Sequence, residues 1–486
     1  MVADHNKVKK TANGIFWTIV GQGSSLVRFA STLVLARLLA PEDFGVIAIA
    51  VSIVSLGHLL KDWGWHQAII QRYEITDEEL SSIFWLIALS SLFISIALLL
   101  LSSYFGRFYN QSQLPYIIAL LIVDLWLRSS FQVPDALLRR EMNFKVHAVA
   151  DLSGGLVGGF AGIAAALMGA GIYSLAIRIV LNSAVLMTIL WHTVTWRPKL
   201  IFGLKYLRSY ASFGIPIFTI GMVGLARSQA EPIIIGKWFS ANDLGIYSMA
   251  FSLATVFTVQ WAQAISRVAY SSLSKEQKNK SDFNHVFLRF NTTILFFILP
   301  IAIYVSHESA RLVSILLGSK WQSAAELLSV LVWTGVGLSM FTIATTALRS
   351  LGKPSIELWL NVAFSIGLII FIIAGALSEN LYTLSIYISF WALLVALISI
   401  CCTLYMIDVP VVLYFKFNKG VLVSAALFAV VINGFDDFLM PGNHGDSTWL
   451  HVLSILAISI TIYILSFTAF ERKDIAKLYS LFARRI

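Results

Sequence analysis

Charged residues are scarce in this chain. Asp, Glu, Lys and Arg together account for 13% of its 486 residues, whereas hydrophobic residues account for 58%. A typical soluble domain has about 25% charged residues, so this composition excludes a soluble globular protein. Apolar runs long enough to cross the roughly 30 Å hydrocarbon layer follow one another with short polar breaks. We therefore predict an all-α polytopic membrane protein with about fourteen transmembrane helices, at 14–38, 43–60, 80–103, 114–134, 147–168, 171–194, 210–235, 244–268, 283–306, 322–347, 355–377, 381–406, 419–435 and 449–469.

Cysteine is almost absent. The two cysteines, Cys401 and Cys402, are adjacent in an apolar run, where they cannot pair in a structural disulfide or supply a recognisable metal site. A soluble domain, a large loop and an Asp-x-Asp metal motif are also missing. The sequence therefore predicts no cofactor, no metal and no enzymatic activity. A membrane glycosyltransferase or polysaccharide polymerase remains the alternative from another functional class.

Negative charge is in deficit, with 26 Asp and Glu against 35 Lys and Arg and a net charge of +9. In the alternating topology, the basic loop residues divide 24 to 4 between the two sides of the membrane, and Lys61 is counted among the 24. The positive-inside rule explains this asymmetry, so nucleic acid is not an expected partner. Both termini are predicted to be cytoplasmic.

The sequence repeats itself at an offset of 200 residues. Segment 14–52 aligns without a gap on 214–252, and the loop 37–45 shares its pattern with 237–245. Each unit would hold six spans and enter the membrane from the same side, so an axis along the membrane normal should relate the two units. The predicted organisation is a cytoplasmic tail (1–13), a six-helix lobe (14–194), a cytoplasmic linker (195–209), a second six-helix lobe (210–406), two further transmembrane helices (407–469) and a basic cytoplasmic tail (470–486).

When the basic residues assigned to loops are set aside, seven remain within or at the ends of the predicted spans, and all seven are arginines. A charge facing lipid at the centre of a helix costs about 2.5–3.5 kcal/mol, so these side chains need a partner or a wet cavity. Two have a carboxylate at i, i+4, in the pairs Asp124–Arg128 and Arg227–Glu231, where mutual neutralisation is an equally good explanation. Arg37 lies near the outer end of its span, where it can snorkel. Polar residues one turn before and one turn after flank the other four: Arg28, Arg178, Arg267 and Arg289.

Each of these four arginines forms a polar stripe on its helix together with the polar residues one turn before and after it, and these stripes predict the kind of substrate. Guanidinium groups bind phosphate with two parallel hydrogen bonds and keep their charge at ordinary pH. We therefore expect an anionic substrate, a phosphate or diphosphate, bound by Arg28, Arg178, Arg267 and Arg289, with Arg128 and Arg227 as further candidates. Hydrogen bonding to neighbouring helices is the structural alternative for each arginine. The candidates for carrying a coupling ion are Asp124, Asp151 and Glu231.

Three segments resemble a known family. They are Leu35-Ala36-Arg37-Leu38-Leu39-Ala40-Pro41-Glu42-Asp43-Phe44-Gly45, Asp62-Trp63-Gly64 with the following Ala68-Ile69-Ile70-Gln71-Arg72 and Glu78-Glu79-Leu80, and Ala136-Leu137-Leu138-Arg139-Arg140 before Phe144-Lys145. The chain resembles the polysaccharide-transport branch of the multidrug/oligosaccharidyl-lipid/polysaccharide exporters, most of all those of the colanic-acid type.

The resemblance implies two six-helix lobes in pseudo-twofold repeat around a central cavity, with two C-terminal helices outside them. It implies translocation of an undecaprenyl-diphosphate-linked oligosaccharide between leaflets of the bacterial inner membrane, from cytoplasmic to periplasmic, for exopolysaccharide or O-antigen synthesis. Coupling to an ion gradient is implied as well. The implied partners are this substrate, membrane lipids, a polysaccharide polymerase and export machinery. In the related lipid II flippases, first-span arginines line the cavity, and Arg28 matches them by span and chemistry.

Two readings within the same superfamily stay open. A cation or drug antiporter would require acidic residues in the cavity, and Asp124, Asp151 and Glu231 are few beside the arginines. A lipid II flippase would use the same anionic chemistry, so the sequence alone does not separate it from an oligosaccharide flippase.

Overall fold

The computed structural model describes residues 23–72, 74–439, 457, 460–461 and 463–468, and within these residues every regular element is a helix. The chain divides into two compact units, residues 1–246 and 247–486, which are described separately below. The predicted tails, 1–13 and 470–486, and most of the predicted span 449–469 lie outside the described residues. The predicted lobe boundaries stay a prediction.

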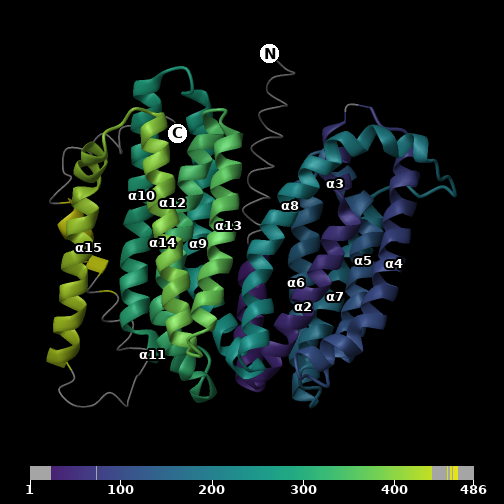
Figure 1. Cartoon of the computed structure of the whole chain (residues 1–486), viewed down its shortest axis with the longest axis horizontal. Helices are drawn as coiled ribbons and strands as arrows, with labels where there is room; N and C mark the ends of the chain where they lie inside the picture. Colours follow the sequence, from purple (N-terminus) through teal and green to yellow (C-terminus); the bar gives the residue numbers. More distant parts are fainter. Residues whose placement is uncertain (1–22, 73, 440–456, 458–459, 462, 469–486) are drawn as a thin grey trace. The chain divides into compact units, whose positions relative to one another are not determined.

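The first unit begins with a helix over residues 23–38. It is followed by α2 (Pro41–Asp62), α3 (Trp65–Gln71), α4 (Asp77–Phe108), α5 (Leu114–Arg140), α6 (Phe144–Leu167), α7 (Tyr173–Thr193) and α8 (Leu204–Trp238) (Figure 1). The short helix α3 was not predicted. It is separated from α2 by Trp63 and Gly64, whose φ angles of 41° and 77° are left-handed and end the longer helix.

The second unit contains most of α9 (Ala241–Lys275), which begins in the last residues of the first unit. The remaining elements are α10 (Lys280–His307), α11 (Ser309–Leu316), the 3₁₀ turn η1 (Ser319–Trp321), α12 (Ser323–Ser350), α13 (Pro354–Ala376), α14 (Leu381–Met406) and α15 (Val411–Leu439). Here α12 packs mainly against α10 and α14.

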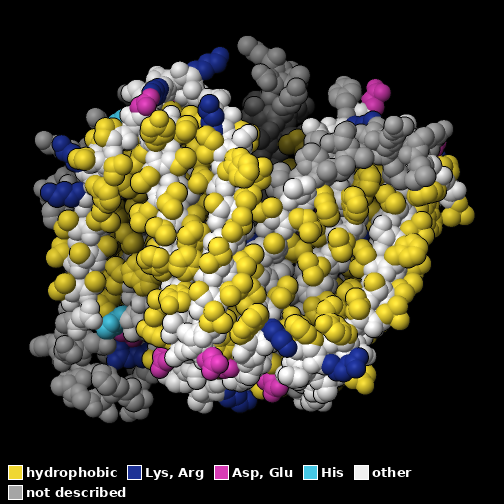
Figure 2. All heavy atoms as spheres, in the orientation of Figure 1, with side chains coloured by type: hydrophobic (Ala, Val, Ile, Leu, Met, Phe, Trp, Pro, Cys, Tyr) yellow, Lys and Arg dark blue, Asp and Glu magenta, His cyan; other side chains and the backbone are white. Residues whose placement is uncertain are grey.

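The helices confirm the all-helical membrane architecture. Eleven of the described helices are long and apolar enough to cross a membrane, and they coincide with predicted spans two to six and eight to thirteen. Predicted span seven, 210–235, lies within the helix α8. Large apolar side chains are exposed along the helices, as on α4, where Leu100 is 77% exposed. On the face shown in Figure 2, hydrophobic side chains cover the helices and charged ones lie towards their ends, as expected for helices surrounded by lipid.

The repeated loop forms the same local structure in both copies. Asp43 accepts a hydrogen bond from the backbone N–H of Ala40 (3.0 Å) at the start of α2, and Asp243 accepts one from Ser240 (3.3 Å) at the start of α9. Each carboxylate therefore caps the N-terminus of its helix, where it also compensates the helix dipole.

Glycines on α6 bring two neighbouring helices unusually close. A Cβ at Gly158 would lie 2.6 Å from the backbone oxygen of Arg178 on α7, and a Cβ at Gly159 would lie 3.0 Å from Ser31 on the first helix. Glycines at 154 and 162 also face α7. Small residues permit this close helix packing within a membrane, and as a result α6 holds the first helix and α7 side by side.

Candidate substrate-binding site

Arg28 is held by a carboxylate on another helix. Its Nη1 lies 2.9 Å from Oδ1 of Asp151 on α6, and its Nη2 donates to Ser25 at 3.2 Å. The hydroxyl of Ser24 donates to the other oxygen of Asp151. The spacing along the sequence did not reveal this partner, because Asp151 lies on a different helix. The Arg28 side chain nevertheless remains 41% exposed, so it stays accessible to a ligand.

Arg178, on α7, lies directly beside Arg28 and has only neutral oxygens as partners among the described residues. Its Nη1 donates to the hydroxyl of Thr32 at 2.6 Å and to the backbone oxygen of Arg28 at 3.4 Å. Of these two neighbouring guanidinium groups, only that of Arg28 is paired with a carboxylate. Since like charges repel strongly when water is excluded, an anion bound between them would stabilise the arrangement.

Arg128, on α5, is the third arginine of the group. Its Nε donates to both oxygens of Asp124 at 2.9 and 3.1 Å, and its terminal nitrogens form no hydrogen bond with any described residue. The same carboxylate accepts from Ser183 and lies 3.3 Å from Nε2 of His58. The predicted pair Asp124–Arg128 therefore exists, but it uses only one of the five guanidinium N–H groups.

These arginines surround a small cavity of about 110 Å³. Asn182 also lines it, and its side-chain Nδ2 is buried without a hydrogen-bond partner in the described part of the chain. A buried donor without an acceptor costs about 1–3 kcal/mol, so this cavity favours a ligand rich in acceptor oxygens. Its full lining is Arg28, Ser31, Arg128, Gly155, Gly158, Gly159, Arg178, Ile179 and Asn182.

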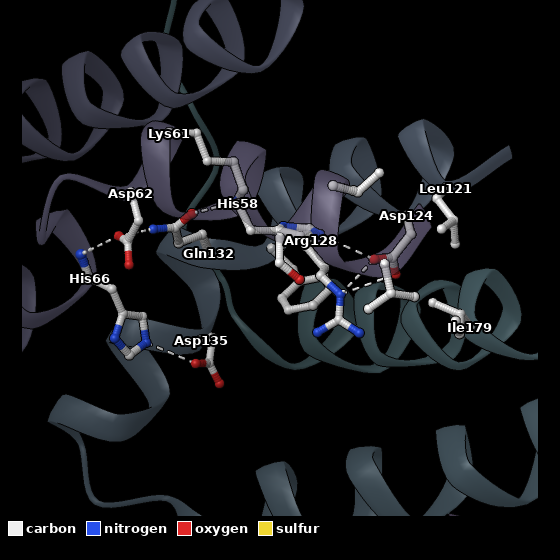
Figure 3. A pocket seen from close by; sticks show the side chains of 14 residues that line it. His58, Lys61, Asp62, His66, Leu121, Asp124, Arg128, Gln132, Asp135 and Ile179 are labelled. Carbon is white, nitrogen blue, oxygen red and sulfur yellow. Dashed lines mark hydrogen bonds and ion pairs between the residues drawn. The ribbon is translucent and has the colours of Figure 1, made fainter. Parts of the chain in front are cut away.

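A larger cavity of about 520 Å³ adjoins the first, and Arg128 and Ile179 line both. Figure 3 shows its polar wall, contributed by α2 and α3 on one side and by α5 on the other. Lys61 is only 4% exposed, and its Nζ donates to Oε1 of Gln132 at 2.8 Å. The amide nitrogen of Gln132 in turn donates to Asp62.

A cluster of charged side chains around Asp135 lies at the end of the larger cavity away from Arg128. Asp135 lies 2.9 Å from Nε2 of His66 and accepts from Nε of Arg139 at 2.8 Å, while its other oxygen lies 2.9 Å from Nδ1 of His147. The left-handed turn after α2 brings His66 back towards α5 and makes this contact feasible. Asp135 therefore has basic side chains from three helices around it, on α3, α5 and α6.

The other predicted site residues lie outside these two cavities. Arg227 and Glu231 are half-buried on α8, one turn apart. In the second unit Arg267 is exposed and lines a separate groove of about 350 Å³ with Gln263, Ser266, Tyr270, Thr342, Thr345, Thr346 and Arg349. Arg289 is half-buried on α10. The structure thus groups Arg28, Arg128 and Arg178 with Asp124 and Asp151.

Sequence reasoning missed several residues of the larger cavity. Lys61 was assigned to a cytoplasmic loop, whereas it is buried in the last turn of α2. A signal was present on α5, where Asp124, Arg128 and Gln132 follow one another at i, i+4 and i+8 and so share one helical face. The stripe on α2, with Ser55, His58 and Asp62 at i, i+3 and i+7, would have identified the opposite wall.

Comparison with known proteins identifies the class. The chain belongs to a family of polysaccharide biosynthesis proteins, whose pattern matches residues 34–326. It is 21% identical to the succinoglycan biosynthesis transport protein ExoT of Rhizobium meliloti, over 97% of this chain and 96% of the relative. It is 25% identical to the lipopolysaccharide biosynthesis protein WzxC of Escherichia coli, over 71% of this chain and 69% of the relative.

Solved structures show the same fold. The lipid II flippase MurJ in an inward closed conformation superposes with a TM-score of 0.76, covering 95% of this chain and all of that one, at 13% identity. An inward-facing multidrug resistance transporter of the MATE family and MOP superfamily gives a TM-score of 0.59 over 81% of this chain and 98% of that one, at 15% identity. The chain therefore shares its fold with MurJ and with this transporter of the MOP superfamily.

Proposed function

We propose that the protein is a flippase that moves a lipid-linked oligosaccharide, carried on undecaprenyl diphosphate, from the cytoplasmic to the periplasmic leaflet by alternating access. Membership of the polysaccharide biosynthesis family, a relative named as a succinoglycan transport protein and the MOP fold support this proposal. The chain acts as a transporter and not as an enzyme. It resides in the bacterial inner membrane with both termini in the cytoplasm, and its substrate passes to a polysaccharide polymerase and export machinery.

The observation that carries the proposal is the arginine cavity. Three guanidinium groups and the unpartnered amide of Asn182 meet around about 110 Å³, and Arg178 has no carboxylate partner among the described residues. A diphosphate offers several acceptor oxygens and negative charge, which match this excess of donors. A cation or drug would instead meet positive charge here. Arg227, Arg267 and Arg289 remain further candidates for contact with the anionic substrate.

Replacement of Arg28 tests the proposal. Arg28→Ala should abolish export, and Arg28→Lys should restore it only in part, because lysine keeps the charge but loses the planar fork. Since Arg28→Ala leaves Asp151 without its cation, the matched variant is the double replacement Arg28→Gln with Asp151→Asn. It removes the charged pair with little change in volume, and it should also fail to export.

The measurement is polysaccharide export by a deletion strain carrying each variant, with the amount of inserted protein determined in the same cells. The lipid-linked glycan that accumulates in the cytoplasmic leaflet of the deletion strain identifies the substrate, and accumulation of lipid II would instead favour a lipid II flippase. Normal export by the double variant at normal abundance would show that Arg28 only links helices.

A further inference from the structure

The Lys61–Gln132–Asp62 cluster has unused hydrogen-bonding capacity. The Lys61 ammonium has three N–H donors and makes one hydrogen bond among the described residues, to the neutral amide of Gln132. On the other side of the amide, Asp62 uses one carboxylate oxygen, which accepts from Gln132 and from the backbone N–H of His66 at 3.5 Å. All three side chains line the cavity of about 520 Å³. The cluster therefore presents a fixed donor and a fixed acceptor to the same space.

The other charges of this cavity are already occupied. Asp124 has Arg128 and His58 as partners, and Asp135 has His66 (Figure 3). Ser183 also contacts Asp124, and Arg139 and His147 also contact Asp135. Among the residues that the structure describes, no cluster of His, Cys, Asp and Glu suits a metal ion. A small anion at the cluster would meet the carboxylate of Asp62, and a cation would meet the ammonium of Lys61. A neutral group that both donates and accepts is favoured over either.

Sugar hydroxyls have this property, since each hydroxyl is one donor and two acceptors. Neighbouring hydroxyls on a ring would accept from Lys61 and donate to Asp62, while Gln132 holds the two charged groups in place. The volume of about 520 Å³ falls within the usual range of about 300–1,000 Å³ for small-molecule sites. The burial of Lys61 means that its remaining donors lack full hydration, so a ligand that satisfies them is favoured.

The larger cavity also lies next to the arginines, where a subsite for an attached sugar would be expected. Arg128 and Ile179 line both cavities, so a group attached to an anion in the smaller cavity can extend directly into the larger one. We propose that the Lys61–Gln132–Asp62 cluster is a sugar subsite, which binds hydroxyls of the sugar next to the diphosphate. This inference rests on the proposed flippase function and adds the part of the chain that recognises the glycan.

Measuring how the purified full-length chain binds two lipids separates recognition of the sugar from recognition of the diphosphate. The probes are undecaprenyl diphosphate without sugar and the lipid-linked oligosaccharide extracted from the deletion strain. Lys61→Met should weaken binding of the glycosylated lipid about tenfold or more, as expected for the loss of a hydrogen bond to a charged group, and should leave the sugar-free lipid unaffected. The Arg28 and Asp151 double variant should weaken both.

Gln132→Glu provides a second variant in case Lys61→Met does not fold. It retains the shape of the side chain but turns the neutral partner of Lys61 into a carboxylate, which withdraws the ammonium from the ligand, so the same selective loss is expected. The control is Lys199→Met, because Lys199 is exposed outside the cavity and bonds Asp77. Thermal unfolding of each purified variant monitors folding.

Three results would overturn the subsite. Equal weakening of both lipids by Lys61→Met and Gln132→Glu would indicate an anion site or a structural link, and unchanged binding of both lipids would show that the cluster only joins α2 to α5. Failure of the wild-type chain to bind either lipid would reject the flippase proposal itself, and the subsite with it.

Discussion

Replacement of Gly158 by alanine tests how the arginine cavity is built. A Cβ at this position would lie 2.6 Å from the backbone oxygen of Arg178, and ordinary contact begins at 3.4 Å. The two helices α6 and α7 must therefore separate by about 0.8 Å locally. Overpacking of this kind typically costs about 1–3 kcal/mol, more than the roughly 0.5–1 kcal/mol that alanine gains over glycine inside a helix. We expect Gly158→Ala to lower the stability of the protein.

The same movement should impair transport. The hydrogen bond of 2.6 Å from Arg178 to Thr32 joins α7 to the first helix, and a shift of about 0.8 Å would bring it near the limit of hydrogen-bonding distance. Arg178 would then lose its position beside Arg28. Displacements of about 1 Å in a binding group can reduce activity by up to about 100-fold, so we expect export to fall by roughly tenfold or more.

Gly155→Ala is the matched control for stability, because the nearest atoms to its Cβ lie at 3.7 Å, which is ordinary contact. The assays are the thermal unfolding midpoint of each purified variant and polysaccharide export by the deletion strain. We expect a lower midpoint for Gly158→Ala and an unchanged or higher one for Gly155→Ala. If both variants unfold at the wild-type temperature, the close contact between α6 and α7 is not the feature that holds Arg178 in place.

Two further predictions concern topology and energy coupling. Reporter fusions after Lys10 and at Ile486 should show cytoplasmic activity only, because the basic loop residues lie overwhelmingly on one side of the predicted topology even when the buried Lys61 is left out. Periplasmic activity at either fusion would reject the proposed topology. We also propose that Asp124, together with His58, carries a coupling proton, because the two side chains contact each other beside Arg128. In reconstituted vesicles, Asp124→Asn and His58→Gln should abolish the response of lipid translocation to a proton gradient, and a full response in these two variants would exclude the pair. Asp151→Asn and Glu231→Gln test the two remaining candidates.

The sequence by itself determined the class of the protein and most of its helices. Apolar runs that span the hydrocarbon layer can form only helices in a membrane, because every backbone polar group must be satisfied within the segment. Length and hydropathy therefore suffice to locate α2, α4 to α7, α9, α10 and α12 to α15. They are insufficient for the short α3 and α11, because helices of seven and eight residues are too short to stand out as membrane-spanning runs.

The arginines could also be found from the sequence, since charge is costly in lipid wherever it lies. Their partners could not. The spacing i, i+4 correctly identified Asp124 for Arg128, because that contact is local to one helix. Arg28 and Asp151 are separated by 123 residues, and their contact depends on how α6 packs against the first helix.

Only the tertiary structure decided which charges share a cavity. The glycines of α6 are visible in the sequence, but the sequence does not show that Gly158 faces α7 while Gly159 faces the first helix. That division brings Arg178 beside Arg28. Likewise, Lys61 has the sequence context of a cytoplasmic loop residue, and its burial follows from the position of Gln132 on α5. Hydropathy gives the free-energy cost of placing a side chain in lipid. The role of that side chain depends on neighbours that are distant in the sequence, and only tertiary packing brings them together.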